Sequence, residues 1–168
     1  MLKKLTLLLV GIGIGFAQYT WAAGNPEKGK ALYAVCVACH GTDGAGNKAL
    51  NSPRIAGQEI WYLERQLKNF KTGVRGANSK DVYGMQMRPM AMTLPNDQAI
   101  ADVAAYVNGL KAKPPVAKIK GDTSAGKAAY MICQTCHGAK GEGNKALNAP
   151  KLINCLLYTL TLPTTSMV

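Results

Sequence analysis

Histidine is scarce in this sequence. The chain of 168 residues contains only two, His40 and His137. Each directly follows a Cys-x-x-Cys pair, and the pairs are Cys36 with Cys39 and Cys133 with Cys136. No histidine therefore remains for a general base, or for a metal site away from these two motifs.

Apolar runs long enough to cross a membrane are also missing at the start of the chain. The stretch Leu5–Ala17 is shorter than the roughly 20 apolar residues that a spanning helix needs. Lys3 and Lys4 precede it, and residues 20–22 offer a small-x-small cleavage site. This layout predicts a secretory signal peptide over residues 1–22, with an uncleaved membrane anchor as the alternative.

Acidic residues are few. The chain has 9 aspartates and glutamates against 20 lysines and arginines, for a formal net charge of +11. Nucleic acid is a poor partner for an exported chain whose lysines are scattered rather than gathered in a run. The charge favours docking to acidic protein partners, or it reflects an ordinary solvated surface.

A tandem repeat organises the rest of the chain. Positions near the first Cys-x-x-Cys-His motif recur at an offset of 97, and Asn47–Asn51 is repeated without change as Asn144–Asn148. Tyr33 recurs as Tyr130, and Pro53 as Pro150. A fixed offset over this length indicates duplication of one unit.

The second copy matches the first only as far as Leu152. We therefore expect a first domain over 23–112, a lysine- and proline-containing linker over 113–121, a partial second domain over 122–152 and an aberrant tail over 153–168. A frameshifted or prematurely terminated gene would explain the tail. A genuine short tail that caps the half-domain is the rival explanation.

The first unit reads as all-α. Asn25, Pro26 and Glu27 form a helix start, and the helix is expected to run into Cys36. Apolar residues at helical spacing predict further helices over 60–70 and 96–110, whereas 73–95 reads as a glycine- and proline-rich loop. No convincing alternating strand pattern appears.

The Cys-x-x-Cys-His motifs predict covalent haem attachment. Residues three and four apart share a helix face, so two thiols can reach the vinyl groups of one porphyrin while the imidazole reaches iron. A thioredoxin-like redox pair would need a βαβ context, which the sequence lacks. A zinc site combining both motifs is disfavoured by the separate glycine-rich loop after each one.

With no histidine left, the sixth ligand of a haem iron must be another donor. Methionine is the natural choice because its thioether favours reduced iron. Four methionines, Met85, Met87, Met90 and Met92, cluster in the predicted loop. Core filling is the alternative role for such residues, but polar neighbours and Pro89 favour a ligand loop.

From Ala23 to about Leu152 the sequence resembles class I cytochromes c, and specifically the two-haem cytochrome c4 family. The resemblance implies the all-α class I cytochrome c fold. Cys36 and Cys39 would be the thioether sites and His40 the proximal iron ligand. The Pro53 carbonyl would accept a hydrogen bond from the His40 ring. The resemblance selects Met87 as the sixth ligand, with Met90 as runner-up.

In the second unit the resemblance carries over to Cys133, Cys136, His137 and Pro150, so a second haem c is expected in addition to the first. The methionine loop has no counterpart there. We expect the second iron to be five-coordinate, or ligated by water or a stray side chain.

The implied function is periplasmic electron transfer rather than enzymatic catalysis. The expected partners are redox proteins with acidic docking surfaces, such as respiratory complexes and a terminal oxidase, with transient contact to a membrane complex. A haem peroxidase is disfavoured because no distal histidine is available. The cytochrome subunit of a dehydrogenase, and a non-functional product of a broken gene, stay open.

Overall fold

The computed structural model describes residues 23–113 and 121–152. The signal peptide expected over 1–22, most of the linker and the tail over 153–168 lie outside the described residues, and those predictions stay predictions. Within the described ranges the chain forms helices and no strand, apart from two isolated bridges at Asn47–Ser52 and Asn144–Ala149. The expected all-α fold is confirmed.

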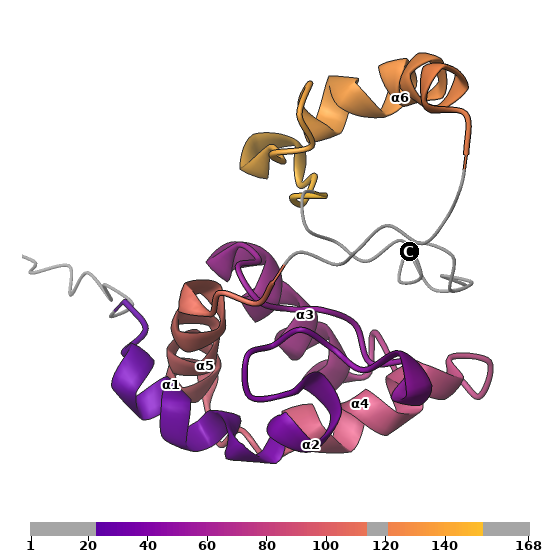
Figure 1. The fold of residues 1–168 in the computed structure, drawn as a ribbon. Helices are drawn as coiled ribbons and strands as arrows, with labels where there is room; N and C mark the ends of the chain where they lie inside the picture. The colour runs from indigo at the N-terminus through magenta and orange to yellow at the C-terminus, as the bar shows by residue number, and fades with distance from the viewer. Residues whose placement is uncertain (1–22, 114–120, 153–168) are drawn as a thin grey trace, which may run out of the picture.

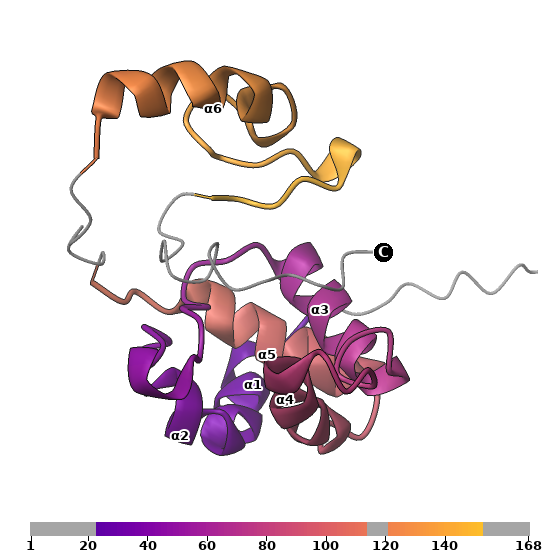
Figure 2. The same cartoon turned by 90° about the vertical axis from the view of Figure 1, so that its right-hand side faces the viewer.

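Short and medium helices follow one another along the chain (Figure 1). In order they are α1 (Pro26–Leu32), η1 (Tyr33–Val35), α2 (Val37–His40), η2 (Lys48–Leu50), α3 (Ile60–Thr72), α4 (Val82–Met92), α5 (Asp97–Gly109), α6 (Thr123–His137) and η3 (Lys145–Leu147). Elements up to α5 form the first unit, and α6 with η3 forms the second (Figure 2). None of these helices is both long and apolar enough to cross a membrane.

Helix α1 starts as its sequence predicts and crosses α5 closely. The Asn25 side chain accepts hydrogen bonds from the backbone N–H groups of Glu27 and Lys28. The Asn25 N–H donates to Asp102 of α5 over 2.7 Å. A Cβ built on Gly29 would lie 2.0 Å from the Asp102 carbonyl oxygen, so only glycine lets the two backbones approach this far.

The core of the first unit lies where α1, α3 and α5 meet. Its members are buried apolar side chains: Tyr33, Leu63, Leu94, Ala99, Ile100, Val103, Ala104 and Val107. Five of them come from α5, and their spacing follows the helical period that predicts a helix over residues 96–110. Cys36 and Val37 pack against the edge of this cluster, so the first haem motif is tied to the core.

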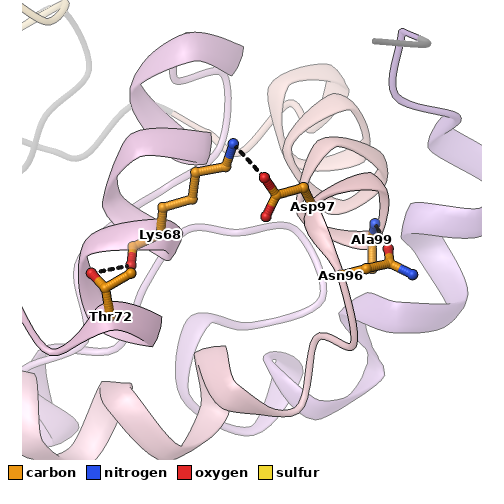
Figure 3. Close-up of polar contacts among 5 residues, drawn as sticks. All are labelled: Lys68, Thr72, Asn96, Asp97 and Ala99. Carbon is orange, nitrogen blue, oxygen red and sulfur yellow. Dashed lines mark hydrogen bonds and ion pairs between the residues drawn. The ribbon is translucent and has the colours of Figure 1, made fainter. Parts of the chain in front are cut away.

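Polar contacts fix how α3 meets the start of α5 (Figure 3). Asn96 caps α5 by accepting from the Ala99 N–H over 2.9 Å. Asp97, in the first turn, pairs with Lys68 of α3 at 3.1 Å. These groups are solvent-exposed, so they set register more than they add stability.

The loop predicted over 73–95 is wrong in its second half, which forms helix α4. Asp81 starts this helix by accepting from Gly84 N over 3.0 Å, and it also accepts from the Gly76 N–H over 2.9 Å. Pro89 lies inside the helix and is exposed. A proline there removes a single backbone donor, and packing of the small Gly84 and Ala91 against the fold offsets that loss.

The second unit repeats the local backbone of the first. Asn51 and Asn148 both adopt φ 54°, the left-handed conformation that asparagine tolerates. Asp122 caps α6 by accepting from the N–H groups of Ser124 and Ala125. In contrast to α5, α6 buries none of its residues. A Cβ on Gly126, the counterpart of Gly29, would meet nothing within 4 Å.

Candidate haem site

The first motif spans the junction between η1 and α2. Cys36 precedes α2 while Cys39 and His40 lie on it, and the His40 N–H donates to the Cys36 carbonyl over 2.9 Å. This helical turn puts all three side chains on one face, as the spacing predicts. Both thiols are free.

The Cys36 thiol is protonated at neutral pH. Burial, with a smaller contribution from Cys39, raises the pKa of Cys36 to about 11. A redox dithiol or a nucleophilic cysteine needs the opposite, a lowered pKa that supplies thiolate. The environment therefore does not favour a thioredoxin-like pair. A protonated, half-buried thiol is compatible with the formation of a thioether bond.

The His40 ring is held in one orientation. Its side chain is buried, and Nδ1 donates to the Pro53 carbonyl over 2.8 Å. Burial lowers the pKa of His40, against the opposing effect of that hydrogen bond. The neutral ring with Nδ1 protonated leaves a lone pair on Nε2, which is the form that binds a metal ion.

Two further contacts brace the backbone around His40. The Tyr33 hydroxyl donates to the Gly41 carbonyl over 2.8 Å. The Gly46 N–H donates to the His40 carbonyl over 2.9 Å. The repeat of Tyr33 as Tyr130 was the sequence signal for this bracing role, which the motif by itself does not reveal.

The second motif has the same geometry. His137 Nδ1 donates to the Pro150 carbonyl over 2.8 Å, and the Tyr130 hydroxyl donates to the Gly138 carbonyl over 2.8 Å. Cys133 and Cys136 are exposed, whereas Cys36 is half-buried. The structure thus orients both histidine rings in the same way, and it buries Cys36 and His40 more than Cys133 and His137.

The methionines of α4 differ in exposure. Met85, Met90 and Met92 are exposed, at 45%, 38% and 54%, whereas Met87 is half-buried. Met87 borders the face of α4 that buries Gly84 and Ala91. Figures 1 and 2 place α4 at the same end of the first unit as α2, which carries His40. Among the candidates, Met87 is the one turned toward the protein.

The two motifs do not form a joint metal site. Within residues 23–113 and 121–152, no group of three or more histidine, cysteine or acidic side chains could hold a metal ion. Each histidine ring instead donates to the carbonyl of a proline in its own unit, Pro53 for His40 and Pro150 for His137. The zinc site weighed from the sequence therefore has no support in the fold.

Comparison with known proteins agrees with this geometry. The family profile described as cytochrome c matches residues 26–111. The chain belongs to the cytochrome c family. It is 37% identical over 163 residues to cytochrome c4 of Azotobacter vinelandii. The alignment covers 90% of this chain and 75% of the relative.

Two other relatives extend the comparison. The crystal structure of reduced recombinant cytochrome c4 from Pseudomonas stutzeri matches with a TM-score of 0.59 and 34% identity, over 77% of this chain and 73% of that one. A thiosulfate dehydrogenase electron acceptor of Thiomonas intermedia is 32% identical over 166 residues, covering 91% of this chain and 69% of the relative. This cytochrome is therefore a c-type haem protein that carries electrons between redox protein partners.

The first unit of this cytochrome fits a haem group. In the described part of the chain, three buried N–H donors have no hydrogen-bond partner: Arg54 Nε, Trp61 Nε1 and Arg88 Nε. Such donors suit a propionate carboxylate. In the chain, Arg54 directly follows Pro53, whose carbonyl accepts from His40 Nδ1. Sequence reasoning missed these residues, because an isolated arginine or tryptophan carries no motif.

Proposed function

We propose that this cytochrome is a periplasmic electron carrier whose first haem is bound by Cys36 and Cys39, with His40 and Met87 as axial ligands. The observation that carries the proposal is the His40 ring, buried and neutral, with Nδ1 engaged by Pro53 and Nε2 left for iron. A bound haem supplies a one-electron Fe(III)/Fe(II) couple.

The residues of the first unit tune that couple and do not transform a substrate. The Pro53 carbonyl fixes the His40 ring and increases its basicity. The Met87 thioether would raise the reduction potential of a bound haem, because a thioether prefers the softer, reduced iron. The apolar cluster beside Cys36 and Val37 excludes water from one side of the site. If His40 and Met87 both bound the iron, it would keep no free position for a substrate, and we propose that the protein is not an enzyme.

The second unit, over residues 122–152, is proposed to hold a second haem through Cys133 and Cys136, with His137 as ligand and Pro150 as its support. The matching 2.8 Å hydrogen bonds of His40 and His137 favour two equivalent proximal sites. The described part of this unit offers no methionine helix like α4. We therefore propose that the iron of a second haem would be five-coordinate, or ligated by water or a stray side chain.

A redox titration with and without carbon monoxide tests both proposals. We expect two reversible one-electron steps, and carbon monoxide should bind one haem only, because Met87 closes the first iron while the second stays open. The measurement is the reduced Soret spectrum during spectroelectrochemistry. Carbon monoxide binding at both haems, or at neither, would contradict the assignment of ligands.

Basic charge supports acidic partners. Lysines and arginines exceed acids by 11 over the chain, so encounters with acidic docking surfaces are favoured at low ionic strength. We propose a terminal oxidase or another respiratory complex as acceptor. The similarity to thiosulfate dehydrogenase electron acceptors makes an enzyme of that kind a candidate donor. Export through residues 1–22 would bring the protein to these partners.

A further inference from the structure

The two units contact each other through a small polar patch, which we call the clasp. On the first unit it consists of Gln58, Glu59 and Arg65, and on the second of Asn148 and Lys151. The Lys151 N–H donates to Glu59 Oε2 over 2.9 Å, and Gln58 Nε2 donates to the Lys151 carbonyl over 3.3 Å. Figure 2 shows the segment after α6 on the side of the second unit that faces α3.

Arg65 forms the other half of the clasp. Its two terminal nitrogens donate to Asn148 Oδ1 over 3.1 Å and to the Asn148 carbonyl over 3.3 Å. Its guanidinium lies 4.9 Å from the ring centre of Trp61 and 5.4 Å from that of Tyr62. Stacking on both rings restricts the side chain before it meets Asn148, which lowers the entropy lost in the contact.

The clasp brackets the residue that orients the second histidine. Asn148 and Lys151 lie on either side of Pro150, whose carbonyl accepts from His137 Nδ1. Asn148 is held at φ 54°, and Ala149 bridges to Asn144. The clasp therefore acts on both ends of the short segment that sets the position of the Pro150 carbonyl.

The first unit holds its own equivalent segment differently. Arg54, the counterpart of Lys151, donates to the carbonyls of Ala112 and Lys113 over 2.9 and 2.7 Å, just after α5. The Gly57 N–H donates to the Val107 carbonyl of α5 over 3.2 Å. In the described residues, the second unit has no helix corresponding to α5. The Lys151 ammonium instead reaches Gly57 of the first unit over 3.4 Å.

We propose that Glu59 and Arg65 of the first unit are positioning residues for the second haem site. They hold residues 148–151 so that Pro150 keeps the His137 ring oriented, a role that α5 and the chain after it fulfil in the first unit. The clasp is a contact between protein groups and does not depend on a haem. Only the expected change in the spectrum and potential rests on the proposed second haem.

The test compares two double variants of the full holoprotein with equal change in charge. Glu59→Ala with Arg65→Ala removes the Glu59 and Arg65 hydrogen bonds of the clasp and leaves that of Gln58. Glu64→Ala with Arg75→Ala is the control, because Arg75 stacks on Phe70 at 4.3 Å and binds Gln66 within the first unit. The readouts are hydrogen exchange of the amides in 143–152, the haem count by mass, and the potential and spectrum of each haem.

Loss of the clasp should raise amide exchange in residues 143–152 by about tenfold or more, because its hydrogen bonds limit local opening. The potential and spectrum of the second haem should change, and those of the first should not. Glu59→Gln, which keeps an acceptor oxygen, should retain most of the protection. Unchanged exchange, or an equal rise in the control, would overturn the proposal. If the wild-type protein carried only one haem, the proposed second haem would be contradicted. The exchange comparison would still show whether Glu59 and Arg65 hold residues 148–151.

Discussion

Replacing Met87 by alanine is expected to lower the reduction potential of the first haem by on the order of 100 mV or more, a fraction of the roughly 0.8 V range that axial ligands span. The thioether preferentially stabilises Fe(II), and water or no ligand would take its place. The open iron should then bind carbon monoxide, so that both haems respond. Spectroelectrochemistry with carbon monoxide measures both effects.

Met90→Ala is the matched control, because Met90 lies on the same helix and is 38% exposed. It should change the potential little and leave the first haem closed to carbon monoxide. If instead Met90→Ala opens the iron while Met87→Ala does not, the two methionines exchange roles. The choice made from the family resemblance and from the burial of Met87 would then be wrong.

Gly29→Ala and Gly126→Ala should have opposite effects although they occupy equivalent places in the repeat. A Cβ at Gly29 would lie 2.0 Å from the Asp102 carbonyl oxygen, so α1 and α5 must move apart. We expect a loss of about 2–3 kcal/mol, typical of overpacking, and a melting temperature lower by roughly 10 °C or more. Circular dichroism melting of the holoprotein measures this.

Gly126 has nothing within 4 Å of the added Cβ. Alanine there should stabilise α6 by about 0.5–1 kcal/mol, because glycine loses more backbone freedom in a helix. Hydrogen exchange of the α6 amides would report it. Destabilisation of similar size at both positions would mean that α6 is covered by a helix as α1 is, which contradicts the second unit as described.

Local chemistry made much of the fold predictable. Asn25 with Pro26 predicted the start of α1, and the apolar period of residues 96–110 predicted α5, because both signals act within a few residues. The two motifs likewise contained their own geometry. A helical turn places the histidine on the same face as both cysteines, whatever surrounds it.

Other features depended on contacts that the sequence does not display. Pro89 argued for a loop, yet α4 forms because Gly84 and Ala91 pack against the fold and Asp81 caps the helix. The clasp joins Arg65 to Asn148 across 83 positions, and neither residue belongs to a Cys-x-x-Cys-His motif. The donors on Arg54 and Trp61 became visible only once burial showed that they lack partners.

Intact mass of the exported, purified protein tests the central claim most directly, because it counts covalent haem groups and shows where the chain has been cleaved. We predict a chain starting after Ala22 that carries two haems. Cys36→Ser with Cys39→Ser should remove one of them and leave the other. A colourless product with the mass of the bare polypeptide, made in cells with a working haem-attachment system, would contradict the account.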